Sequence, residues 1–131
     1  MNIGWMRVVL GALLLEIALF AVLVPISFVN LTLFLTAVPI GVFAFGYFVT
    51  RWLLRNLSTG LLLHGALIGT VATVMYFGLV LAQPGGIGAA VAVYGAPLFY
   101  FSQAMRIAGC VAGAMHEQRR RSLAPSRLAK V

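Results

Sequence analysis

The stretch VVLGALLLEIALFAVLVPISFV, residues Val8–Val29, decides the fold class of this chain. A helix of about 20 apolar residues crosses the hydrocarbon core of a bilayer, and this stretch reaches that length with Glu16 as its only charged residue. Backbone polar groups in lipid need partners within the chain, and the stretch lacks the alternating pattern of a barrel strand. It therefore predicts a transmembrane helix.

Three further apolar stretches of similar length follow it. The connections between them are short, so sequential helices must run antiparallel. The sequence thus predicts an all-α membrane protein, an antiparallel bundle of four transmembrane helices. The expected helices cover about residues 8–29, 31–50, 59–82 and 89–117, in one transmembrane domain of residues 1–121.

The composition agrees with a membrane protein. Of the 131 residues, 63% are hydrophobic and only 8% are charged, and the mean hydropathy is +1.07. Soluble domains carry about a quarter charged residues. The net charge of +7 does not indicate nucleic-acid binding, because the basic residues lie at the edges of apolar stretches and in one short tail.

Charged residues also predict the orientation. The basic residues outside the apolar stretches are Arg7, Arg51, Arg55, Arg119, Arg120, Arg121, Arg127 and Lys130. All of them fall on one side of the expected bundle, and by the positive-inside rule that side is the cytoplasm. We expect a bacterial inner-membrane protein with both termini inside, and a flexible basic tail over residues 122–131 that is attracted to anionic lipid headgroups.

Two charged residues lie within the apolar stretches, Glu16 and Arg106. Charges in hydrocarbon are costly, so such residues usually face a partner or a water-filled cavity. Glu16 lies about 13 Å along the first helix from Arg7, and Arg106 lies about 15 Å from His116 at the inner boundary. His64 falls at about 13 Å by the same count from Arg55. The sequence therefore predicts an intramembrane polar cluster at one depth, formed by Glu16, His64, Gln103 and Arg106.

Three interpretations of this cluster remain open. Glu16 and Arg106 can form an ion pair that fixes the register of the first and fourth helices. Alternatively, Arg106 extends toward the headgroups and leaves Glu16 protonated. In the third interpretation Glu16 exchanges protons or a cationic substrate, which requires a raised pKa that a nearby Arg106 would oppose.

The segment Gly11-Ala12-Leu13-Leu14-Leu15-Glu16 resembles the first helix of the small multidrug resistance transporters, four-helix proteins with a glutamate in that helix. The resemblance covers less than a tenth of the chain and implies a test of transport. The residues after Glu16 lack that family's lysine and polar run, and the third helix lacks its tryptophan-containing glycine motif. The one-sided charge distribution also disfavours the dual-topology assembly of that family.

Two GxxxG patterns predict close helix packing. Gly65 and Gly69 lie in the third helix, and Gly109 and Gly113 lie in the fourth. Small residues at this spacing let helix backbones approach closely in lipid. We expect a contact between the third and fourth helices, with dimerisation as the alternative.

No arrangement of residues indicates enzymatic chemistry. There is no nucleophile–base pattern, and the two histidines and single cysteine are too few and too scattered for a metal site. We therefore expect no enzyme, no catalytic residue, no cofactor and no metal. Two functions are consistent with the sequence. The first is a non-enzymatic accessory, assembly or structural subunit, in a larger membrane complex or a homo-oligomer. The second is a small oligomeric proton- or cation-coupled transporter using Glu16.

Overall fold

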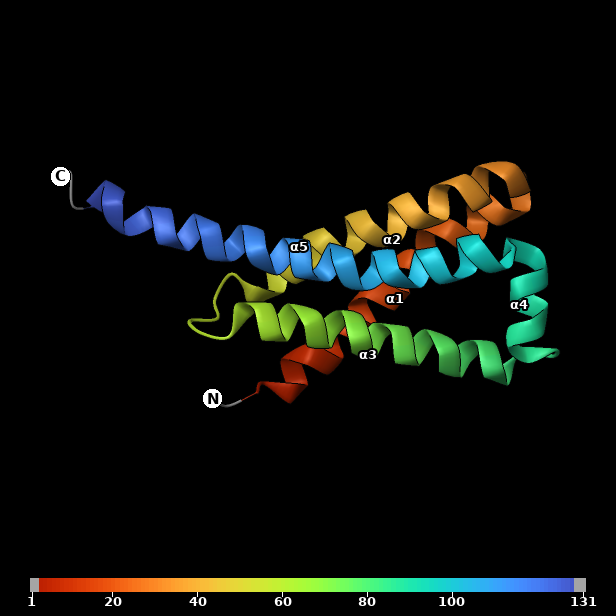
Figure 1. Ribbon diagram of the computed structural model, residues 1–131, viewed down its shortest axis with the longest axis horizontal. Helices are drawn as coiled ribbons and strands as arrows, with labels where there is room; N and C mark the ends of the chain where they lie inside the picture. The colour runs from red at the N-terminus through yellow and green to blue at the C-terminus, as the bar shows by residue number, and fades with distance from the viewer. Residues whose placement is uncertain (1–2, 129–131) are drawn as a thin grey trace.

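The computed structural model describes residues 3–128, which form five helices and no strand (Figure 1). The helices are α1 (Trp5–Val29), α2 (Leu31–Leu54), α3 (Leu61–Ala82), α4 (Gly86–Tyr94) and α5 (Ala96–Leu128). The prediction of an all-α fold is confirmed. Three helices, α1, α2 and α3, are each long and apolar enough to cross a membrane, and there are up to four spans if the strongly bent pair of α4 and α5 is counted as one.

Four of the helices, α1, α2, α3 and α5, surround a common centre. Both α2 and α3 contact α1 on one side and α5 on the other. The order around the bundle is therefore α1, α2, α5, α3, and α1 and α5 face each other across the diagonal. The buried apolar core includes Leu15, Val42, Leu54, Ile68 and Cys110, contributed by all four of these helices.

A single residue, Asn30, separates α1 from α2. Its backbone is extended, with φ −156° and ψ 113°, and its side-chain oxygen accepts a hydrogen bond of 3.1 Å from the Leu33 amide. This is N-cap geometry, which satisfies one of the unpaired amides at the start of a helix. The chain reverses here without a glycine or proline because the asparagine ends one helix and caps the next.

The prediction of one continuous fourth helix over about residues 89–117 is wrong. The chain breaks at Gly95, where α4 and α5 meet at a bend of 100°. Gly95 has φ 79°, a conformation that favours glycine, and its amide donates to the Val91 carbonyl at 2.8 Å. Pro97 then lies in the first turn of α5, where its missing amide costs nothing. Pro97, which falls inside the predicted helix of residues 89–117, therefore lies at the start of α5 instead.

Both GxxxG patterns lie at backbone contacts with a neighbouring helix. A Cβ at Gly65 would lie 2.6 Å from Ala114 Cβ, so this pattern faces α5 as expected. A Cβ at Gly109 or Gly113 would collide with backbone of Phe43 or Tyr47 in α2. The glycines of α5 therefore pack against α2 rather than α3, and α5 is in close contact with two helices at once.

The start of α1, the α2–α3 connection and the end of α5 lie at the same end of the bundle (Figure 1). We call this the basic end, because these segments and the last turn of α2 contain Arg7, Arg51, Arg55, Arg119, Arg120 and Arg121. The sides of the bundle expose large apolar residues such as Phe28, Ile40 and Val74. A broad exposed apolar surface of this kind indicates contact with lipid or with other membrane helices.

Helix α5 continues beyond its predicted end and includes residues 122–128. Residues 129–131 of the expected basic tail, with Lys130, lie outside the described residues. The other boundaries differ from those expected by up to four residues, because α1 begins at Trp5, α2 extends to Leu54 and α3 begins only at Leu61.

Candidate functional site

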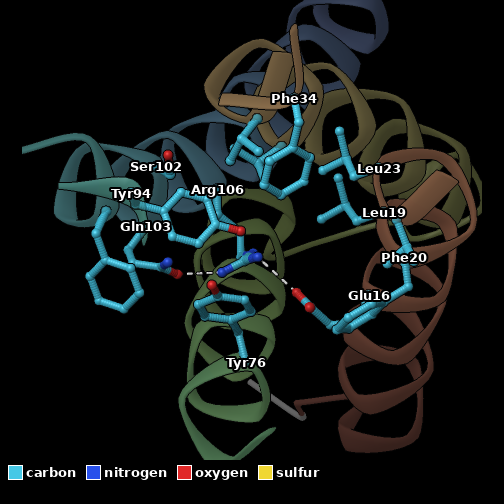
Figure 2. Close-up of a pocket in the computed structure, with 14 residues that line it drawn as sticks. Glu16, Leu19, Phe20, Leu23, Phe34, Tyr76, Tyr94, Ser102, Gln103 and Arg106 are labelled. Atoms are coloured by element: carbon cyan, nitrogen blue, oxygen red, sulfur yellow. Dashed lines mark hydrogen bonds and ion pairs between the residues drawn. The ribbon is translucent and has the colours of Figure 1, made fainter. Parts of the chain in front are cut away.

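Glu16 and Arg106 form an ion pair in the centre of the bundle. Arg106 Nε lies 3.0 Å from Glu16 Oε1, and each residue is 4% exposed (Figure 2). Glu16 comes from α1 and Arg106 from α5, so the pair spans the diagonal of the bundle. The two long side chains connect helices whose backbones do not pack closely against one another.

Two further groups hold the Arg106 guanidinium. Arg106 Nη1 donates to Gln103 Oε1, one turn earlier in α5. The guanidinium carbon lies 4.5 Å from the centre of the Tyr76 ring, which is a cation–π contact from α3 (Figure 2). The charge of Arg106 is therefore compensated by an anion, an amide and an aromatic face.

The structure brings together three members of the predicted polar cluster, Glu16, Gln103 and Arg106. His64 does not join them. Its buried ring accepts a 3.1 Å hydrogen bond from the Gly4 amide at Nε2, while Nδ1 lies 2.7 Å from the Gly60 carbonyl. A single neutral tautomer, protonated at Nδ1, satisfies both contacts.

The position of His64 has a simple geometric cause. The expected depth of His64 assumes a continuous helix from Arg55, whereas α3 begins only at Leu61. His64 therefore lies in the first turn of α3, near the basic end, and fastens the N-terminal segment to that helix. Residues 55–60 connect the helices without advancing along the bundle as a helix would.

The ion pair lies at the polar end of a cavity of about 90 Å³. Tyr76, Tyr94, Ser102 and Gln103 also contribute to this end (Figure 2). The remaining wall is apolar and includes Leu19, Leu23, Phe34, Val38 and Phe99. All five helices contribute to the lining, and α4 does so through Tyr94.

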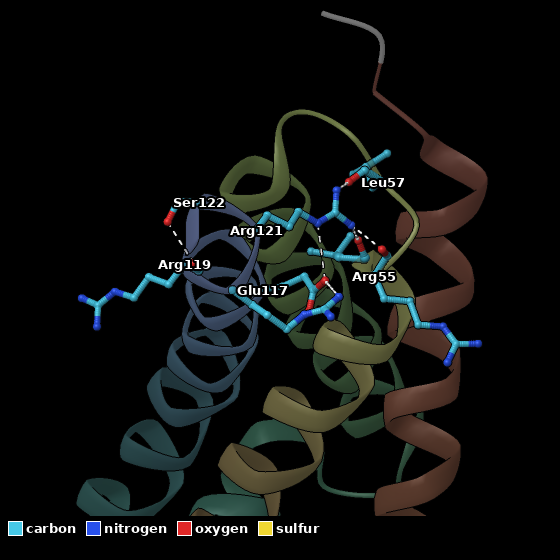
Figure 3. A network of polar contacts seen from close by, with 8 residues as sticks. Arg55, Leu57, Glu117, Arg119, Arg121 and Ser122 are labelled. Carbon is cyan, nitrogen blue, oxygen red and sulfur yellow. Dashed lines mark hydrogen bonds and ion pairs between the residues drawn. The ribbon is translucent and has the colours of Figure 1, made fainter. Parts of the chain in front are cut away.

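A second network of charged residues lies at the basic end (Figure 3). Glu117 is 1% exposed and accepts from Arg120 at 2.5 Å and 3.1 Å. Arg121 Nε lies 3.4 Å from the same carboxylate. We call Glu117, Arg120 and Arg121 the Glu117 network.

Arg121 extends this network to another helix. Its guanidinium donates to the carbonyls of Leu54, at 2.8 Å, and of Arg55 and Leu57 (Figure 3). The last carbonyls of a helix have no partner within it and carry partial negative charge. Arg121 therefore caps the C-terminal end of α2 from α5.

Sequence reasoning missed this network. The spacing of Glu117 to Arg120 and Arg121, three and four residues, was a visible signal for pairs within one helix. The reach of Arg121 to α2 had no such signal, because backbone carbonyls of a distant segment leave no trace in a residue pattern.

Among residues 3–128, no three His, Cys, Asp or Glu side chains gather at one point to hold a metal ion. Cys110 is buried, close to the backbone of Gly46 and Gly69. What the bundle interior offers is one paired charge of each sign beside a partly apolar cavity.

Comparison of the chain with family models, with curated proteins and with solved structures finds no match.

Proposed function

We propose that the chain is a small polytopic inner-membrane protein that acts without catalysis, as an accessory, assembly or structural subunit. The observation that supports this proposal is the 3.0 Å Glu16–Arg106 ion pair at the centre of the bundle. A carboxylate already paired with an arginine is poorly suited to exchange protons, and well suited to fix two helices in register.

The proposal includes four spans with both termini in the cytoplasm. The bent α4–α5 pair supplies the fourth span, with α5 crossing and α4 lying across one end of the bundle (Figure 1). The concentration of arginines at the basic end supports a cytoplasmic location for that end. Trp5 and Trp52, both exposed at this end, suit the headgroup region. Arginines there favour anionic lipids, and the exposed apolar sides suit partner helices or a second copy of the chain.

The ion pair can be tested by its effect on stability. Removal of one partner of a buried pair leaves an uncompensated charge and costs about 3–5 kcal/mol, whereas replacement of both partners by uncharged groups costs far less. We expect Glu16→Gln and Arg106→Gln each to lower the free energy of unfolding by about this amount, and the double variant to recover most of the loss. Unfolding by SDS titration from mild detergent measures these differences.

A matched control is Gln118→Ala, which removes an exposed polar side chain elsewhere on α5. It should leave the unfolding free energy unchanged within about 0.5 kcal/mol. Stable single variants, or a double variant less stable than either single one, would contradict a structural pair.

A second candidate is a small oligomeric carrier that uses Glu16 to couple protons or cations. One observation favours it: Glu16 lines the cavity rather than being packed on all sides. A carrier predicts a stable but inactive Glu16→Gln variant and proton release by the parent protein on substrate binding. Stability loss in Glu16→Gln, with no proton release across a broad panel of cations, would remove this candidate.

A further inference from the structure

The cavity beside the ion pair has the form of a ligand site with a polar end and an apolar wall. Its volume of about 90 Å³ exceeds the roughly 30 Å³ that one water molecule occupies in the liquid. The wall includes two phenyl rings, Phe34 and Phe99, and the aliphatic side chains of Leu19 and Leu23. An occupant must therefore be apolar over most of its surface.

We call the polar end of the cavity, where the ion pair lies, its floor. Two polar atoms there, Glu16 Oε2 and Arg106 Nη2, can each make a further hydrogen bond. Within the described residues, no hydrogen bond reaches Glu16 Oε2 or Arg106 Nη2, because the ion pair uses Oε1 and Nε and the Gln103 contact uses Nη1. Neither of these two atoms is fully enclosed by protein. Both side chains line the cavity. One atom can accept a hydrogen bond and the other can donate one.

The charge of the floor selects the charge of the ligand. Glu16 and Arg106 together carry no net charge, so an anionic or cationic headgroup would bring an uncompensated charge into a site of low dielectric. A neutral group that both donates and accepts avoids this cost. A hydroxyl does so through one atom, donating to the carboxylate and accepting from the guanidinium.

The lining of the cavity extends to the exposed side of the bundle at α1. Two of its lining residues, Phe20 and Val24, are 44% and 38% exposed. Both lie in the apolar part of α1, beyond Glu16 as seen from the basic end. A molecule dissolved in the bilayer can therefore reach the floor sideways, with the rest of its apolar chain remaining in the lipid.

We propose that this cavity binds a neutral, membrane-dissolved molecule that carries a hydroxyl on an apolar chain or ring, with the hydroxyl bridging Glu16 and Arg106. The ion pair then has two roles, because it holds α1 to α5 and also recognises the hydroxyl. This binding role goes beyond the structural role of the pair, and the two are tested by different measurements.

Photolabelling of the parent protein in lipid nanodiscs tests the proposal. Four probes share one long alkyl chain with a photoreactive group near its head, and end in a hydroxyl, a carboxylate, an ammonium or a methyl group. The pH is set so that the acid and the amine are ionised. We expect the alcohol to label α1 and α2 around Leu23 and Phe34 about tenfold more than the other three probes. Excess unlabelled alcohol should abolish this labelling.

Two sets of variants sharpen the test. Glu16→Gln leaves the floor with a net positive charge, so the preference should change from the alcohol to the carboxylate; Arg106→Gln should change it to the ammonium. Val38→Leu, which adds volume at the buried cavity wall, should reduce labelling by the alcohol. Val29→Leu, at an exposed position of α1, is its control.

Equal labelling by all four probes, or preference of the parent protein for a charged probe, would overturn the proposal. So would an absence of labelling in the cavity, which would mean that water fills it. The photolabelling results test only the ligand proposal. The structural role of the ion pair is tested separately, by the unfolding free energies of the Glu16 and Arg106 variants.

Discussion

Arg121 shows how much one side chain contributes at the basic end. Its guanidinium donates to three backbone carbonyls near the end of α2, those of Leu54, Arg55 and Leu57. It also contacts the buried carboxylate of Glu117. Hydrogen bonds from a charged donor are worth about 1.5–3 kcal/mol each when the partner would otherwise be unsatisfied. Carbonyls near the membrane surface can hydrogen-bond to water once the arginine is removed, so the net loss is well below the sum over the three bonds and amounts to about 1–3 kcal/mol in total.

We therefore expect Arg121→Gln to lower the free energy of unfolding by about 1–3 kcal/mol. Arg121→Lys should recover only part of the loss, because an ammonium lacks the planar fork that reaches several carbonyls. SDS titration measures both changes. Arg119→Gln is the matched control, since Arg119 is exposed and its side chain reaches no partner in the part of the chain that the structure describes. An equal effect of both glutamine variants would show that charge alone, and not the cap, matters.

The residues of the site were only partly predictable. Glu16 and Arg106 could be placed together because both lie in continuous helix, where residue count converts directly into depth. The depth of His64 could not be predicted, because the residues that connect α2 to α3 do not form a helix and so do not add a fixed rise per residue. Tyr76 could not be identified as a partner of Arg106 either, since aromatic residues are frequent in every helix of this chain.

At the scale of the elements, α5 organises the bundle. Its Gly109 and Gly113 face α2, and Gly65 and Gly69 of α3 face α5. The helix is therefore held closely on two sides. Without a hydrophobic force between helices in lipid, such close backbone contact is a main source of association energy. Changes that separate α5 from either neighbour should weaken the whole bundle.

Alanine substitution of the glycines tests this packing. Gly109→Ala places a methyl group against the Phe43 backbone, and overpacking of this kind costs about 1–3 kcal/mol. Gly78→Ala in α3 meets open space within 4 Å and should instead stabilise the helix by about 0.5–1 kcal/mol. Unfolding free energies of the two variants should thus change in opposite directions. A loss of dimerisation in Gly109→Ala without loss of monomer stability would instead indicate a role between copies.

The number of helices was harder to predict than their existence. Apolar length identified each helical region, because a bilayer-spanning helix has a narrow range of lengths. The division of the fourth region into α4 and α5 was missed because Gly95 and Pro97 are individually tolerated in membrane helices. In the structure the 100° bend coincides with a positive φ at Gly95 and a proline two residues later.

At the scale of the whole molecule, the proposed topology makes the two ends of the bundle chemically distinct. The α2–α3 connection belongs to the basic end, and the α3–α4 connection lies at the opposite end (Figure 1). We expect Ser58→Cys to react with a membrane-impermeant maleimide only from the cytoplasmic side, and Gln83→Cys only from the outside. Intact and permeabilised cells distinguish these cases. Cys110 is buried and serves as the internal background control, and labelling of Ser58→Cys in intact cells would reverse the orientation.

The contacts that α5 makes with α1, α2 and α3 have a consequence for biosynthesis. It is the last of the described helices to leave the ribosome, yet it supplies Arg106 to Glu16, Arg121 to the end of α2, and the surface against which Gly65 packs. A nascent chain stopped before Ala96 holds α1, α2 and α3 in the membrane with these partners missing. The arrival of α5 in the membrane therefore sets the earliest moment at which the bundle can close.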